Sequence, residues 1–473
     1  RDCLLSRGLG DVYKRQISLI ESIVICLISY ILALFIVNDL SYTPIANWVD
    51  ADIRLSQYKG LILLTALIAI LTGCLAGLYP AIRSSSYAPA LVLKGSFGLS
   101  PKGKKLRVAL IGFQYTVSIA LIIVTLFMGL QNHFMTSSEQ LGFNKDQVAI
   151  VNLTPEIYAK HKPQYIQKLK DYPGIEDVAF SVYELSKEDD MIDLEYARHE
   201  DKDVFFKVFY ASENFLSVMD IQVEEGRDFT REDLNKAQSD YIINPAAERD
   251  FHLHPGDRFN DRTVLGVSKD FRFNSCRIAS SPFVFALNND IPNPKLVSYI
   301  RFNSKTNLQE AVAHVRETLK EIDPTFPFEI SFYNTILNNL YQKEQTLGKL
   351  ISLFGIMAIL ISIVGVFGLV LFETQYRRKE IGIRKINGAT TGQILLMFNK
   401  TYIRIVSVCF IISIPIAWMG TQQWLENFAY KTPLHLWVFI VAFLIILSVT
   451  IGTVTFRNWQ AANENPVNSV KSE

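Results

Sequence analysis

The chain has 473 residues, of which 49% are hydrophobic, so it is too long for one ordinary core and too apolar in blocks for a uniformly soluble protein. Its net charge of +1 is divided unevenly, because residues 131–345 carry 35 acidic and 24 basic side chains, a net charge of −11, whereas the remainder is basic. The uneven charge therefore predicts that different parts of the chain lie in two different environments. Nothing in the sequence indicates nucleic acid as a partner.

The first sixteen residues, RDCLLSRGLGDVYKRQ, do not share the pattern of the rest. They lack the apolar core and the small-residue cleavage site of a signal peptide. We interpret residues 1–16 as a non-native or artefactual leader; the alternative is a native basic cytoplasmic loop. On either interpretation we expect the natural protein to begin upstream of this sequence.

Six apolar runs are long enough to cross a bilayer, which takes about 20 helical residues. Helices are expected because a spanning segment must satisfy its own backbone hydrogen bonds in lipid. Gly73 and Gly77 have the spacing that lets two membrane helices approach closely. The expected spans are residues 17–38, 60–82, 107–130, 346–372, 402–420 and 435–456.

The charges of the connecting segments predict how these helices are oriented. Residues 83–107 hold six basic and no acidic side chains, and basic segments beside a span mark the cytoplasmic side. The segment 373–393 is also basic, so counting spans places residues 131–345 outside and the tail 457–473 inside. The predicted fold class is a multi-pass α-helical protein of the inner membrane with one α+β extracytoplasmic domain.

The stretch Gly98–Lys105, GLSPKGKK, nearly matches a phosphate-binding loop. It has Lys105 where that loop needs a Ser or Thr hydroxyl, and no predicted strand precedes it. We therefore interpret residues 83–106 as a cytoplasmic basic linker, and we expect this chain to bind no nucleotide or other cofactor.

Residues 131–345 show the pattern of a mixed α and β domain. Short segments bounded by Gly, Asn, Asp and Pro predict strands, and the apolar periodicity of Leu308–Ile322 predicts an amphipathic helix. Closely spaced strands in the middle predict an inserted β-rich subdomain. The expected strands are Gln147–Leu153, Glu176–Ser181, Val204–Tyr210, Asp240–Asn244, Arg262–Val267, Phe283–Leu287, Lys295–Phe302 and Phe328–Tyr333, with a further helix over Glu156–Leu169.

We predict no catalytic and no metal-binding residues in this domain. Glu248, His252 and His254 could imitate a metal cluster, but no supporting ligand spacing follows them, which favours a surface cap. The acidic run 188–193 is typical of a solvated loop. Cys276 has no partner cysteine within the domain, so we expect no disulfide.

The segment 373–393 has the pattern of a short helix, a stop and a second helix. Glu380 precedes Arg384 by one turn, in the favourable order of charges. Gly388 suits the left-handed residue that ends a helix, and Thr390–Gln393 matches a capping box.

Three isoleucines make this helix a candidate docking surface. Ile381, Ile383 and Ile386 lie on a piece too short to cross a bilayer, so they need a partner surface. One alternative is a groove of another protein, and the other is an amphipathic hairpin that lies on anionic lipid. The physical pattern leaves both open.

A short internal repeat accompanies the helices. Pro89–Lys94, PALVLK, follows the second span at about the distance at which Pro466–Lys471, PVNSVK, follows the last. Duplication of this kind matches the two-half plan of transporters.

The sequence RRKEIGIRKINGAT at 377–390 resembles the signature of the MacB/FtsX family of ABC transporter permeases. The motifs EGRDF, INPAA and GVSKDF, which begin at Glu225, Ile243 and Gly266, are similar to that family's periplasmic core. Asn387 departs from the apolar residue usual before Gly-Ala. The resemblance implies a MacB-like periplasmic core domain at 131–345.

The same resemblance implies an FtsX-like permease domain at 346–456, with three membrane helices and a coupling helix that engages a separate ATPase subunit. It also implies that residues 17–82 are the last two membrane helices of a first permease half. One helix, an ectodomain, its returning helix and a coupling helix of that half would then be missing. The ATPase-coupling residues that the resemblance implies are Arg378, Lys379, Glu380, Ile381, Gly382, Ile383, Arg384, Lys385 and Gly388.

The implied function is that of a non-catalytic permease subunit. ATP hydrolysis by a partner chain would move the periplasmic domain and export a peptide, drug or lipoprotein by mechanotransmission. Expected partners are the ABC ATPase, membrane lipid, a second permease in a homo- or heterodimer, and a periplasmic adaptor or outer-membrane protein. The alternative is an FtsX-like transmembrane regulator of an extracytoplasmic cell-wall hydrolase; an enzyme would need a catalytic group that the sequence does not show.

Overall fold

The structure, a computed structural model, describes residues 2–43, 58–84, 101–137, 141–186, 193–236, 238–272, 275–287 and 296–462. The chain forms two compact units. Arg1–Ile122, Thr346–Ile414 and Ile440–Glu473 make the first, and Ile123–Gln345 with Pro415–Phe439 make the second. The repeat tails at 89–94 and 466–471, and the acidic residues 188–190, lie outside the described residues.

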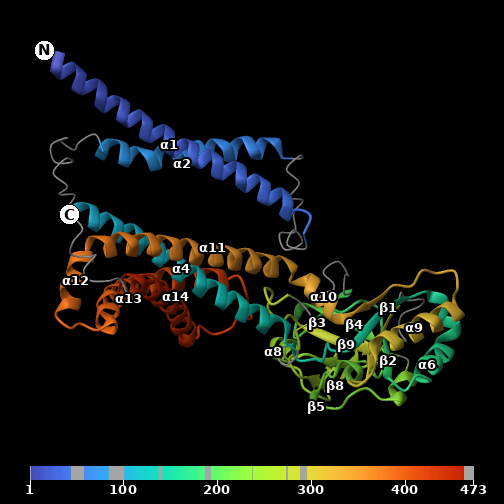
Figure 1. Cartoon of the computed structure of the whole chain (residues 1–473). Coiled ribbons are helices and arrows are strands. Elements are labelled where there is room, and N and C mark those ends of the chain that lie inside the picture. The colour runs from blue at the N-terminus through green and yellow to red at the C-terminus, as the bar shows by residue number, and fades with distance from the viewer. Residues whose placement is uncertain are drawn as a thin grey trace. The chain divides into compact units, whose positions relative to one another are not determined.

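The first unit is built from helices (Figure 1). Six of the helices in the described part of the chain are long and apolar enough to cross a membrane, which confirms the number predicted from sequence. The helices are α1 (Asp2–Leu40), α2 (Lys59–Ser84), α4 (Pro101–Thr136), α11 (Gln342–Tyr376), α12 (Arg378–Ile386), α13 (Thr391–Leu425) and α14 (Leu436–Ala462). The candidate spans are Arg15–Leu40, Lys59–Leu78, Val108–Thr136, Gln342–Tyr376, Thr391–Leu425 and Leu436–Trp459.

Helices α1 and α2 pack closely at the two glycines singled out in the sequence. A Cβ atom on Gly73 would lie 2.8 Å from the Cα of Ile23, and one on Gly77 would lie 2.9 Å from the Cβ of Ser22. The Tyr30 hydroxyl also donates to the Ile62 carbonyl at 2.7 Å. Small residues therefore allow the close helix approach, as predicted.

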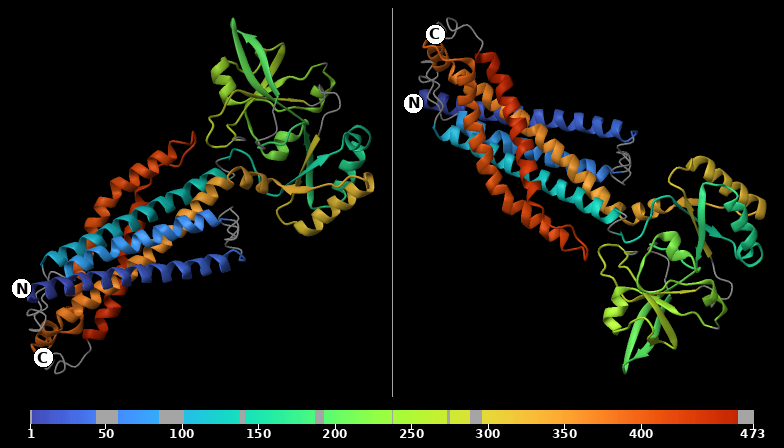
Figure 2. Two further views of the ribbon diagram at one scale, coloured as in Figure 1. Left: turned by 90° about the horizontal axis from the view of Figure 1, so that it is seen from above. Right: turned by 90° about the horizontal axis from the view of Figure 1, so that it is seen from below.

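Buried polar side chains join the other helices of this unit. The Ser118 hydroxyl of α4 lies 3.0 Å from that of Ser362 on α11. The Tyr115 hydroxyl of α4 lies 2.9 Å from that of Thr450 on α14. Figure 2 shows these helices side by side in both views. Hydroxyl pairs of this kind fix which faces of neighbouring apolar helices meet.

The second unit contains an 11-stranded sheet, whose main path runs β11-β1-β10-β2-β4-β9-β6-β8-β5. Strand β3 pairs with β4, and β7 pairs with β8. The strands are β1 (Val148–Leu153), β2 (Ile175–Ser181), β3 (Asp193–His199), β4 (Lys202–Ala211), β5 (Val223–Gly226), β6 (Tyr241–Ile243), β7 (Arg258–Phe259), β8 (Arg262–Ser268), β9 (Phe283–Leu287), β10 (Leu296–Phe302) and β11 (Ile330–Phe332).

The inserted β-rich subdomain predicted from sequence is present in this sheet. Strands β3 to β9 lie between β2 and β10 in the sequence, and they occupy one end of the strand order. A single residue pair, Ser181 with Ala211, joins β2 to β4 and so connects the two parts of the sheet. Strands β1, β2, β10 and β11 form the other part.

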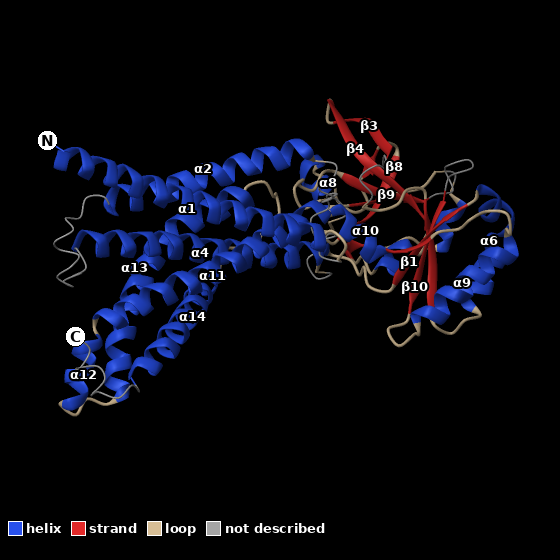
Figure 3. Cartoon of the chain, turned by 45° about the horizontal axis from the view of Figure 1, so that its top comes forward, coloured by secondary structure: helices blue, strands red, loops and turns tan. Residues whose placement is uncertain are grey.

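Helices cover both faces of the sheet, because its central strands are apolar on both sides. All five residues of β9 are buried. Helices α6 (Lys162–Lys170) and α9 (Leu308–Ile322) lie side by side over one face, where Leu169 and Val315 enter one core cluster (Figure 3). Helices α7 (Phe215–Met219) and α10 (Tyr333–Leu340) contribute to a second cluster.

Several short elements were not expected from sequence. They are β3, β5, α7, α10 and α8 (Pro245–Phe251). Helices of five to eight residues are too short to display an apolar period. The helix predicted over Glu156–Leu169 begins instead with a π-helical turn, Ile157–His161, and Pro163 then lies in the first turn of α6.

Candidate functional site

The segment 373–393 folds as a short helix, a stop and a second helix, as predicted. Helix α12 ends at Ile386, and Gly388 follows with φ of +85°, in the left-handed region. The Thr390 amide donates to the Gln393 side-chain oxygen at 3.1 Å, and the Gln393 amide donates to the Thr390 hydroxyl at 3.3 Å. This capping box opens α13 and fixes where the chain turns.

Charged pairs stabilise α12 along one side. Arg384 Nη2 lies 2.8 Å from Glu380 Oε1, which confirms the predicted pair one turn apart. Arg377 lies 3.0 Å from Glu373 and 3.8 Å from Glu380. These ion pairs run from Glu373 at the end of α11 to Arg384 in α12, so they connect the two helices.

The isoleucines of α12 divide into two groups. Ile381 is only 4% exposed, because it packs within its own unit, so it needs no foreign surface. Ile383 is 55% exposed and Ile386 is 66% exposed. Gly382 is buried. The side chains of Arg378 and Lys379 lie outside the described part of the structure.

Polar contacts tie the last turn of α11, directly before α12, to α13 and α14. The Tyr402 hydroxyl of α13 donates to Glu373 at 3.3 Å. The Thr374 hydroxyl donates to the Asn458 side-chain oxygen of α14 at 2.7 Å. The Arg377 guanidinium lies 5.9 Å from the ring centre of Phe398. Sequence reasoning missed these partners, although a carboxylate at the end of an apolar run is a recognised sign of a specific contact.

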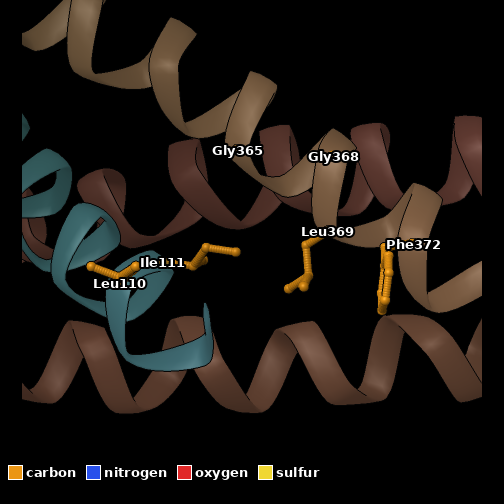
Figure 4. Close-up of a pocket in the computed structure, with 6 residues that line it drawn as sticks. All are labelled: Leu110, Ile111, Gly365, Gly368, Leu369 and Phe372. Carbon is orange, nitrogen blue, oxygen red and sulfur yellow. The ribbon is translucent and has the colours of Figure 1, made fainter. Parts of the chain in front are cut away.

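An apolar cavity of about 320 Å³ lies beside the same helices. Figure 4 shows Leu369 and Phe372 of α11 projecting toward the space beside Leu110 and Ile111 of α4. Gly365 and Gly368 complete the lining. None of these six residues has a polar side chain, so none offers a side-chain group for acid, base or nucleophilic chemistry.

Of Glu248, His252 and His254, for which the sequence favoured a surface cap over a metal site, only Glu248 and His254 come together. His252 is the left-handed residue that ends α8, with φ of +52°. His254 Nδ1 lies 3.6 Å from Glu248 Oε1, and these two gather with Glu225 so that the candidate ligand atoms lie within 4.8 Å of one another. Glu225 and His254 are exposed, and exposed acidic groups commonly gather in this way without a metal ion.

Comparison with known proteins adds a family match. Residues 352–466 match the family model described as FtsX-like permease C-terminal. Two relatives are described as "Macrolide export ATP-binding/permease protein MacB". The one from Aggregatibacter actinomycetemcomitans is 25% identical over 212 residues, 42% of this chain and 32% of the relative. The one from Neisseria gonorrhoeae is 25% identical over 223 residues, 44% of this chain and 34% of the relative. The chain spans about a third of the length of these curated relatives.

Two solved structures also align with this chain. The periplasmic region of MacB from Actinobacillus actinomycetemcomitans aligns with a TM-score of 0.31 and 15% identity, over 42% of this chain and 94% of that one. The extracellular domain of the ABC-type transporter YknZ from Gram-positive bacteria aligns with a TM-score of 0.29 and 16% identity, over 39% and 98%. The six candidate spans and the family match identify a multi-pass protein of the inner membrane whose mixed α and β domain is extracytoplasmic.

Proposed function

We propose that this chain, a permease of the MacB/FtsX type of ABC transporter, couples ATP hydrolysis by a separate ATPase subunit to movement of its extracytoplasmic domain. The observation that carries the proposal is α12, a helix fixed at its base that exposes Ile383 and Ile386 beside the basic Arg384. Apolar anchors at helical spacing with a flanking charge suit a groove on a partner protein.

The residues assigned to this contact extend from Arg378 to Lys385, together with Gly388. Because α12 joins α11 to α13, a partner that displaces α12 pulls on both helices. Helix α11 leads directly to residues 131–345, which we assign as the periplasmic core domain, and residues 346–456 form the permease domain. ATP-driven closure of the partner would move this periplasmic core domain without requiring substrate to pass between the membrane helices.

We assign export of a peptide, drug or lipoprotein to this assembly, which we expect to contain two permeases. The names of the relatives include macrolide export, and their ATP-binding function accords with an ATPase in the complex. A periplasmic adaptor or outer-membrane protein would receive the cargo. This chain itself supplies no catalytic group to the scheme.

A pulldown tests the docking surface. Glu380→Lys with Gly388→Pro removes the pair to Arg384 and the left-handed stop, so we expect the double variant to lose the ATPase that copurifies with the wild type. Glu200→Lys, the same charge reversal on an exposed turn of the other unit, is the matched control and should retain it. Equal retention by the double variant would contradict this contact, and copurification of a cell-wall hydrolase instead of an export partner would favour the regulatory alternative.

A further inference from the structure

The outer loop, which we define as residues 426–435 between α13 and α14, is part of the core of the extracytoplasmic domain. Phe428 is 3% exposed and belongs to the same buried cluster as Phe271 and Tyr341. Tyr430 packs against that cluster as well. A loop that only linked two membrane helices would expose such aromatic side chains, so the domain's core is incomplete without it.

A buried glutamine holds this loop to α4. Gln131 is fully buried, and its side-chain nitrogen donates to the Tyr430 carbonyl at 3.0 Å. Its side-chain oxygen accepts from the Thr432 amide at 2.8 Å. One side-chain amide thus pairs with the backbone of two loop residues as a neighbouring strand would, and both of its buried polar groups are satisfied.

The segment 275–280 of the extracytoplasmic domain holds the loop from another direction. The Tyr430 amide donates to the Cys276 carbonyl at 3.1 Å, and the Tyr430 hydroxyl accepts from the Ser280 amide at 3.1 Å. The Arg272 guanidinium lies 4.2 Å from the ring centre of Tyr430, within the range of a cation–π contact. Tyr430 is therefore fixed by its backbone, its ring and its hydroxyl.

An ion pair connects this contact to the start of α11. Arg277 lies over the Phe428 ring at 5.1 Å, and its Nε lies 2.7 Å from Glu344 Oε1. The Glu344 side chain is only 7% exposed, which makes this pair more constrained than a surface one. Arg277 thus contacts both the outer loop and the first turn of α11.

From these contacts we infer that the outer loop is a latch that fastens the outer ends of α13 and α14 to the extracytoplasmic domain, with Gln131 and Tyr430 as its positioning residues. The inference rests on the proposed function for its mechanical meaning. Helix α13 begins at Thr391, shortly after Gly388, the last of the assigned coupling residues, and ends at Leu425, directly before the loop. In this scheme, displacement of the coupling residues moves the domain only when α13, as well as α11, is fastened to it.

Hydrogen–deuterium exchange of the full chain in lipid nanodiscs tests the latch without any partner. In the wild type, amides of 430–432 should exchange far more slowly than an open loop. Gln131→Leu removes the acceptor of the Thr432 amide, and we expect exchange there to rise about tenfold or more, the factor that corresponds to about 1.4 kcal/mol. Gln423→Leu, at an exposed glutamine of α13, is the matched control and should leave it unchanged.

Slow amide exchange in strands β1 and β10 shows that a variant keeps the domain folded. If exchange in these strands becomes fast in Gln131→Leu, that variant has unfolded the domain, and Tyr430→Phe is used instead to test the latch. Tyr430→Phe deletes only the acceptor of the Ser280 amide and should raise exchange at that amide. Rapid exchange of 430–432 in the wild type, or no change at Ser280 in Tyr430→Phe, would overturn the latch.

A second arm tests transmission in the complex with the copurifying ATPase. We expect Gln131→Leu to bind the ATPase as the wild type does but to lose the ATP-dependent change in exchange within the extracytoplasmic domain. An unaltered ATP-dependent change would refute the role of the latch in transmission. If the wild type binds no ATPase, the proposed function fails, whereas the exchange of 430–432 still decides whether the latch exists.

Discussion

The docking surface proposed on α12 allows a quantitative prediction. Ile383 and Ile386 are 55% and 66% exposed, so together they offer little more than one whole isoleucine for burial by a partner. Burying an isoleucine side chain contributes about 1.5–3 kcal/mol. If the partner covers what is exposed, Ile383→Ser with Ile386→Ser should weaken binding of the ATPase by about 2–3 kcal/mol, which is roughly 30- to 150-fold in Kd.

The assay is biolayer interferometry of the permease in nanodiscs against the purified ATPase. Ile278→Ser is the matched control, because Ile278 is 59% exposed but belongs to the extracytoplasmic domain. Ile381→Ser is unsuitable, since that side chain is buried within the chain itself. A change below threefold in the double variant, or an equal loss in the control, would refute the reasoning. Unchanged ATPase binding with reduced flotation on anionic vesicles would instead support the lipid-bound hairpin.

Two further predictions concern the extracytoplasmic domain. Gly226→Ala should lower the unfolding temperature more than Gly256→Ala does. Both glycines have φ above +75°, but of the two only Gly226 would place the added Cβ 2.2 Å from a backbone oxygen, that of Leu265. Equal shifts of the two variants in thermal melts would contradict this. Arg227 hydrogen-bonds Asp233 at 2.7 and 2.9 Å and holds the pKa of that buried carboxyl well below its usual range. This stabilisation is fully present above the unfolded pKa of about 4 and is lost progressively as pH falls from there through the lowered folded pKa. The difference in melting temperature between Asp233→Asn and wild type should therefore narrow as pH is lowered from 6 to 3, and a constant difference would refute the assignment.

The elements that the sequence predicted well are those whose signals are local. Leu308–Ile322 forms a helix with the predicted bounds, because the apolar period that predicts it lies within one segment. The capping box at Thr390 and the left-handed Gly388 were predicted for the same reason. In each case, residues a few positions apart determine the backbone, so no knowledge of tertiary packing is required.

The contacts that define the sites depend instead on residues far apart in the sequence. Gln131 and Thr432 are 301 positions apart, and Thr374 and Asn458 are 84 apart. Nothing near Gln131 in the sequence indicates that its amide pairs with a loop. The available signal was composition alone: a glutamine at the end of an apolar run has to satisfy its polar groups with some partner once it is buried. That argument predicts that a partner exists and cannot identify it.

Two groups of polar contacts bear on how movement is passed along α13. Tyr402 and Asn458 hold the last turn of α11 at Glu373 and Thr374, directly before α12, whereas Gln131 and Tyr430 fix the outer loop at the far end of α13. A helix transmits displacement only if both of its ends are held, because a free end moves without load. Helix α13 has 35 residues, and at about 1.5 Å per residue it is long enough to connect the two places across a bilayer. Cutting the latch should therefore uncouple the extracytoplasmic domain even where α11 remains intact, which separates this scheme from one in which α11 carries the displacement alone.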